Sequence, residues 1–275
     1  MDTTENWKLA WQAYKMKCET SFLVRQGLVA CGLVQDIDFE NIYRKPEFVS
    51  EHEGRAAYLY CVIMLWQSFN DLIEPFGGDY KTMPKDDKER VEHRLHFSSV
   101  DPALVFFLLA HDIGEIRCGD TLDDGSIMHE LTRSEEAMTM DELFNRLPPS
   151  LLSYFRELRL AFEGYDADSN VNAAFIKAVE KAEAIAFQLF LHEKGFDGDI
   201  TLKKPPSERD LLYAEVLGTN TAADVWALHY RVAVKDIDPD ILRPVTTFLQ
   251  TAFLESYNCL PECMTIDIST LNVET

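Results

Sequence analysis

An apolar run that ends in a charged pair constrains this chain more than any other feature. Residues 103–110 are apolar throughout, and His111 and Asp112 follow them directly. Charged residues rarely enter a protein core without a partner or a metal ion. The run predicts a buried helix over 101–117, and the pair near its end marks a candidate site.

The residues around this run fit the same interpretation. Asp101 can cap the helix, and Pro102 can occupy its first position. Glu115 follows the charged pair at helical spacing, and Asp120 lies in the polar loop beyond it. Each of the two acids has an alternative to a role in the site: Glu115 as a surface carboxylate, and Asp120 as a residue that stabilises a turn. Both alternatives stay open.

Composition limits the class of protein. The chain has 275 residues, of which 47% are hydrophobic, which is enough for one large domain or for one domain with an appendage. The net charge of −21 argues against binding long nucleic acid but leaves a small anionic substrate open. No apolar stretch is long enough to span a membrane, and no secretory signal is visible. The six cysteines are scattered, which favours a reduced, cytoplasmic protein.

Helical periodicity recurs along the chain, and no convincing alternating strand pattern is found. The fold class predicted is therefore all-α. Residues 75–100, which are rich in Gly, Asp and Lys, are interpreted as an exposed, loop-like insertion. Helices are expected within 7–31, 50–66, 101–117, 130–145, 149–164, 171–193, 208–217, 222–234 and 240–257.

Candidate metal ligands are distributed over three of these helices. His52 begins one helix, for which Ser50 is the expected N-cap, and the pair at 111–112 belongs to the second. On the third helix, Glu180 shares the apolar side, and Glu183 is the competing carboxylate. A metal-dependent hydrolase needs such ligands to converge on one point from rigid elements.

The motifs that carry these residues resemble those of the HD-domain metal-dependent phosphohydrolases. The group most similar contains the 5′-deoxynucleotidases. The resemblance implies a compact helical bundle, often a homodimer. It covers roughly residues 32–191. We expect an HD-type helical domain over 1–195, with an insertion at about 75–100, and a C-terminal helical extension over 196–275 that packs on the same domain. The stretches that resemble the family are 46–52, 111–115, 119–121, 134–138 and 175–180.

The resemblance also implies roles for single residues. One divalent metal ion, chosen among Mn, Fe, Co, Ni and Zn, would have four protein ligands. Glu115 would act as the acid/base residue, and Asp120 would help to place water or substrate. The four implied metal ligands are His52, His111, Asp112 and Glu180.

The sequence departs from the family pattern at three places. Glu180 stands where the family has an aspartate, and the Arg-Trp pair that holds the nucleotide is missing from 34–39. The insertion at 75–100 and the region after 195 have no counterpart in the family. Arg44 is a candidate replacement for that pair. Arg55 and Arg117 are the nearest positive charges for a phosphate group, although both are also suited to neutralising nearby acids.

The function predicted is removal of phosphate from a nucleoside 5′-monophosphate or a similar small phosphoester. The alternative is an HD-fold ligand-binding or scaffold protein that has lost catalysis. A third alternative, oxygenase chemistry at two irons, would need additional histidines near the metal from among His93, His96 and His129.

Overall fold

The structure is a computed structural model. It describes residues 3–21, 49–78, 80–96, 100–112, 127–145, 149–162, 170–194, 227–228, 230–231, 233–261 and 264. In these residues every regular element is a helix and no strand is present, so the predicted all-α class is confirmed.

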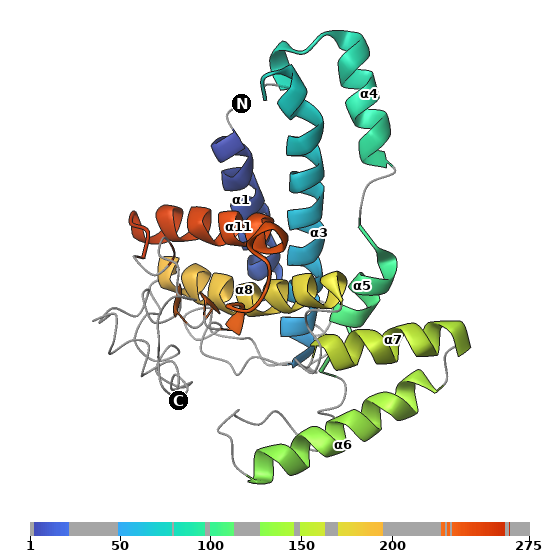
Figure 1. The fold of residues 1–275 in the computed structure, drawn as a ribbon. Helices are drawn as coiled ribbons and strands as arrows, with labels where there is room; N and C mark the ends of the chain where they lie inside the picture. The colour runs from blue at the N-terminus through green and yellow to red at the C-terminus, as the bar shows by residue number, and fades with distance from the viewer. Residues whose placement is uncertain are drawn as a thin grey trace, which may run out of the picture.

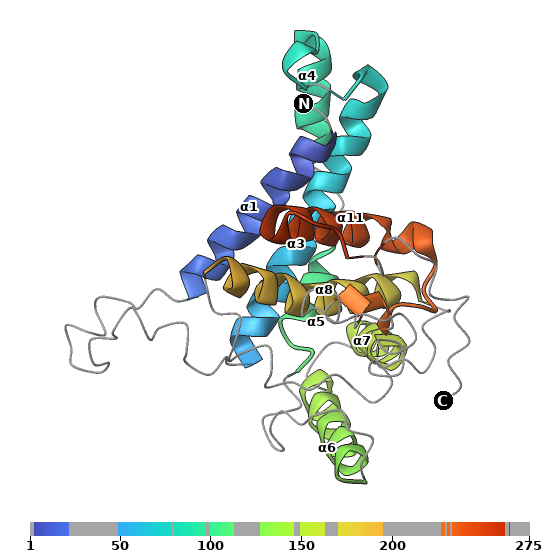
Figure 2. The same ribbon diagram turned by 90° about the vertical axis from the view of Figure 1, so that its left-hand side faces the viewer.

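Helix α8 lies at the centre of the packing. It contacts α1, α3 and α11, and it is buried along most of its length from Ala173 to Leu191. A helix that is apolar nearly all round is expected in a core. Figures 1 and 2 show α8 and α11 side by side, with both crossing α3, and α1 beside α3. The bounds of these helices are α1 Thr3–Ser21, α3 Val49–Ile73, α8 Val171–Glu193 and α11 Pro239–Tyr257.

Three shorter helices lie near the N-terminal end of α3. Helix α5 packs against α3 and α8, and α7 packs against α8 and α6. Phe155, Leu158 and Phe162 of α7 recur at helical spacing and are all buried, which explains why this helix presents one face to the core. The bounds are α5 Pro102–Leu108, α6 Ile127–Phe144 and α7 Pro149–Phe162.

Helix α5 ends earlier than its sequence predicts. The Asp101 side chain caps it by accepting a hydrogen bond from the Ala103 N–H, as expected. The helix stops at Leu108, however, and residues 109–112 form a turn instead of its continuation. The expectation of one helix over 101–117 is therefore wrong for this part, and His111 and Asp112 lie just past a helix end.

Two hydrogen bonds explain the early end. In a continued helix the Asp112 N–H would donate to the Leu108 carbonyl. Instead, Asp112 donates to the carboxylate of Glu53 on α3, and the Leu108 carbonyl accepts from His111 Nδ1. The helical hydrogen bond between Asp112 and Leu108 is thus replaced by two others: the His111 side chain bonds to the Leu108 carbonyl, and Glu53 of α3 accepts the Asp112 N–H.

Residues 75–100 contain more regular structure than expected, since the sequence predicted an exposed, loop-like insertion. They include the short 3₁₀ segment η3 (Tyr80–Thr82), helix α4 (Lys85–His96) and the last two residues of the 3₁₀ segment η2 (Glu74–Phe76). Ile73, Met83 and Val91 form a small separate hydrophobic cluster that holds this region to the end of α3. Figures 1 and 2 show α4 at the end of α3 away from α5.

Other boundaries vary in how well they were predicted. The helix over 171–193 is confirmed to the residue, and α11 begins one residue before the expected start at 240. Helix α3 begins at Val49, so Ser50 lies inside it rather than at its cap. The helix expected over 208–217 lies outside the described residues.

Because Asp101 fixes the start of α5, its removal should destabilise the helix that leads to His111 and Asp112. We expect Asp101→Ala to lower the free energy of unfolding by about 1 kcal/mol, measured by urea denaturation. Asp101→Asn is the matched control, since asparagine caps helices about as well. An equal loss in both variants would contradict the capping role.

Candidate metal centre

His111 is held with one ring nitrogen fixed and the other turned toward Asp112. Its Nδ1 lies 2.8 Å from the Leu108 carbonyl oxygen, which can only accept, so Nδ1 carries the proton. Its Nε2 lies 3.2 Å from Asp112 Oδ2. Burial lowers the pKa of His111 and so favours the neutral ring, in which Nε2 presents a lone pair. The ring also packs edge-on against Phe162, with centroids 5.6 Å apart.

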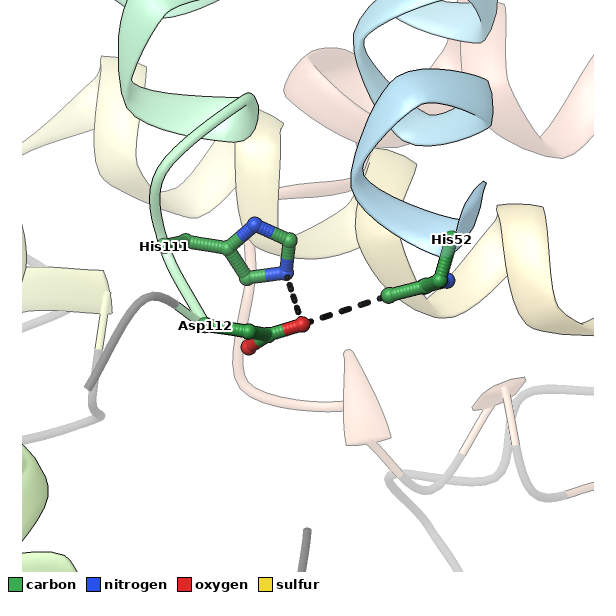
Figure 3. A group of neighbouring side chains, drawn as sticks. All are labelled: His52, His111 and Asp112. Carbon is green, nitrogen blue, oxygen red and sulfur yellow. Dashed lines mark ion pairs between the residues drawn. The ribbon is translucent and has the colours of Figure 1, made fainter. Parts of the chain in front are cut away.

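His52 approaches the same carboxylate from α3. Its Nε2 lies 3.9 Å from Asp112 Oδ2 and 3.8 Å from Glu180 Oε1. Its Nδ1 points the other way and contacts Glu183 Oε2 at 2.5 Å. Figure 3 shows both imidazoles close to the Asp112 carboxylate, with a dashed line for an ion pair from each ring to the same oxygen. Both histidines therefore turn Nε2 toward one point.

Glu183 is the buried group that orients His52. Its side chain is 0% exposed, and it contacts Arg55 Nε at 2.5 Å in addition to His52. The Tyr14 hydroxyl on α1 donates to the same carboxylate at 2.8 Å. A carboxylate behind a ligating imidazole fixes its tautomer and raises its basicity. The sequence analysis had Glu183 as a rival of Glu180 for the metal, but the two lie at different nitrogens of one ring.

The residues present fit a divalent metal ion. Among the described residues, His52, His111 and Asp112 form the group that offers one ligand atom each within 4.8 Å of one another. Donor atoms about 2.0–2.2 Å from a tetrahedral ion lie roughly 3.4 Å apart, close to the separations seen here. Two buried atoms of this region, His111 Nε2 and Glu180 Oε2, have no hydrogen-bond partner. Unsatisfied buried polar atoms are costly, and a cation would satisfy both.

Glu180 lies at the edge of this group. Its Oε1 approaches His52 but also accepts a hydrogen bond from Lys181 Nζ at 3.1 Å. The extra methylene of glutamate, compared with aspartate, is compatible with this outward position. Its assignment as fourth ligand stays a prediction, supported by the unpartnered Oε2.

The electrostatics of the centre favour positive charge. Burial lowers the pKa of His52, but the charges of Glu183, Glu180 and Asp112 and the Glu183 hydrogen bond outweigh it and raise the pKa to about 9. Burial raises the pKa of Glu183, whereas Arg55 and His52 lower it to about 2. Glu183 therefore stays charged near neutral pH, and the raised pKa of His52 indicates that the acids around it favour a positive charge, which a metal ion would supply.

Arg55 does not lie where a substrate contact requires. It is 1% exposed, pairs with Glu183, and its guanidinium stacks 3.8 Å from the centroid of the Phe187 ring. This burial argues against its predicted contact with substrate, and places it behind His52 as the counter-ion of Glu183. The predicted residues Glu115, Asp120, Arg44 and Arg117 lie outside the described residues, so their roles stay predictions.

Glu53 is a site residue that the sequence analysis missed as such. Its Oε1 accepts the Asp112 N–H at 3.3 Å and so ties α3 to the turn after α5. Burial and the charge of Asp112 raise its pKa to about 7. Its position next to His52 was the available signal, but the spacing from Ser50 suggested a capping box instead.

Comparison with known proteins supports one family. Residues 94–204 match the family model of the HD domain. The matched range includes His111, Asp112 and Glu180 but begins after His52, which the fold brings to them. The match supports an HD-domain family for the chain and, in general terms, metal-dependent hydrolysis.

No curated protein and no solved structure matches the chain significantly. None of the helices in the described part of the chain combines the length and apolar character needed to cross a bilayer.

Removing the charge of Glu183 should destabilise the fold, because Arg55 would then be buried without its counter-ion. We expect Glu183→Gln to lower the free energy of unfolding by about 3–5 kcal/mol in urea denaturation without added metal. Glu255→Gln is the control, since its pair with Lys8 is partly exposed and should contribute less than about 1 kcal/mol. Equal effects of the two substitutions would contradict the central role of Glu183.

Proposed function

We propose that this protein is a metal-dependent phosphohydrolase that removes phosphate from a nucleoside 5′-monophosphate or a similar small phosphoester. The observation that carries the proposal is the convergence of His52 of α3 with His111 and Asp112 of the turn after α5, with one ligand atom from each within 4.8 Å of the others. The HD-domain match supports the reaction class. The nucleotide preference comes from the resemblance of the motifs to the 5′-deoxynucleotidases.

The chain supplies a preorganised ligand set. The metal ion would lower the pKa of water at the site and polarise a phosphoryl oxygen. His52 and His111 would each hold it through Nε2, because Nδ1 of each ring is tied to a fixed acceptor. Asp112 would supply the oxygen between them, and Glu180 the fourth position.

The remaining steps are assigned to residues beyond the described part. Glu115 would hold or deliver the proton that moves between the attacking water and the departing 5′-oxygen. Asp120 would help to place the water or the substrate. Homodimer formation and a cytoplasmic location stay predictions from the sequence.

Activity should depend on the histidine pair. We expect purified protein with added Mn²⁺, Co²⁺ or Zn²⁺ to release phosphate from at least one member of a panel of nucleoside 5′-monophosphates. His111→Ala should reduce release by about 100-fold or more, as is typical when an essential catalytic group is lost. His192→Ala is the matched control, because His192 stacks on Tyr257 at the other end of α8. No release from any substrate by the parent protein would contradict the proposal.

The alternative function, a ligand-binding or scaffold protein without catalysis, is favoured by the position of Glu180 outside the group of three, where its Oε1 lies closer to Lys181 Nζ (3.1 Å) than to His52 Nε2 (3.8 Å). Elemental analysis separates the two functions. We expect about one transition-metal ion per chain in the parent and strong depletion in His52→Ala, because a ligand is lost. A metal-free parent that takes up no added metal would favour the scaffold.

A further inference from the structure

Two lysines of α8 lie beside Glu180, the candidate metal ligand on the same helix. Lys177 and Lys181 are one helical turn apart, so they share a face, and Glu180 lies between them in the sequence. Lys181 Nζ contacts Glu180 Oε1 at 3.1 Å, and that oxygen lies 3.8 Å from His52 Nε2. The ammonium group is therefore separated from the candidate ligand nitrogen by a single carboxylate oxygen.

Lys177 is positioned by an aromatic ring of the same site. Its Nζ lies 4.3 Å from the centroid of the Phe162 ring, which itself packs against the His111 ring. Lysine ammonium groups are attracted to such ring faces. Both lysines are half-buried, and the Lys181 side chain is 28% exposed, so each is ordered while still reaching solvent.

A phosphomonoester needs positive charge that the carboxylates of this centre oppose. The substrate carries close to two negative charges near neutral pH, and the negative charges of Asp112 and Glu180 would repel it. Arg55 is occupied by Glu183 in the core. The lysine pair supplies two charges next to Glu180, where burial raises the pKa of the carboxyl group and both lysines lower it.

We propose that Lys177 and Lys181 form the phosphate-binding edge of the centre, and this inference rests on the proposed phosphohydrolase function. Lysine binds phosphate as a compact charge and without the fork geometry of arginine. The pair would contact the non-bridging oxygens of the phosphoryl group and hold it beside the metal position. Its contribution would be to substrate binding and orientation rather than to proton transfer.

The test compares affinity for inorganic phosphate with affinity for metal. We expect isothermal titration of Mn²⁺-loaded protein with inorganic phosphate to show a Kd for phosphate at least about tenfold higher in Lys177→Gln/Lys181→Gln than in the parent, because charge-assisted hydrogen bonds are lost. Mn²⁺ affinity should stay the same or increase, because Glu180 loses its neutralising partner. Lys177→Arg/Lys181→Arg should bind phosphate within about threefold of the parent, since the charge is kept.

The charge-matched control is Lys85→Gln/Lys88→Gln on α4, which removes the same charge at the far end of α3 and should leave phosphate affinity unchanged. Unchanged phosphate affinity in Lys177→Gln/Lys181→Gln, or a parallel loss of Mn²⁺ affinity, would overturn the inference. The single variant Lys181→Gln gives the same comparison if the double variant does not fold.

The two proposals can fail separately. If the parent hydrolyses phosphoesters and the lysine variants keep its KM and phosphate affinity, the lysine assignment is wrong and the function stands. If the parent binds phosphate through the lysines but hydrolyses nothing, the binding edge stands and catalysis is refuted. A parent that binds no phosphate at all overturns the inference.

Discussion

The buried carboxylate of Glu183 is the interaction on which the rest of the centre depends. This carboxylate belongs to α8. It contacts a ring nitrogen of His52 and the guanidinium of Arg55, both on α3, and it accepts a hydrogen bond from the hydroxyl of Tyr14 on α1. Three helices therefore meet at one side chain inside the core. Packing and site geometry are consequently coupled, because a shift of any of these helices would turn the His52 ring.

The centre has two sides with different charge. Behind His52, Glu183 and Arg55 neutralise each other in the core, where an unpaired charge would be costly. In front, Asp112 lies between the two imidazoles, with Glu53 and Glu180 close by. The front side therefore brings acidic side chains together with two buried atoms that have no hydrogen-bond partner, which is an environment that a divalent cation stabilises.

Sequence reasoning predicted the local features well and the tertiary ones poorly. The helix over 171–193 was placed to the residue because apolar residues continue along it, and the structure shows that Asn170 caps its start. The early end of α5 could not be predicted, since its cause is a hydrogen bond from Asp112 to Glu53, which lies 59 residues earlier. The same holds for Arg55, whose charge suggested phosphate binding until the fold placed Glu183 beside it. Periodicity identifies which residues are buried, but not which buried charges meet.

The most direct test is an anomalous-scattering map from crystals of the protein grown with Mn²⁺, Co²⁺ or Zn²⁺. If these residues hold the metal ion, the map will show one strong peak about 2.0–2.2 Å from Nε2 of His52, Nε2 of His111 and an oxygen of Asp112. Well-ordered crystals with no peak between these three side chains, or with the peak at other residues, would contradict this assignment.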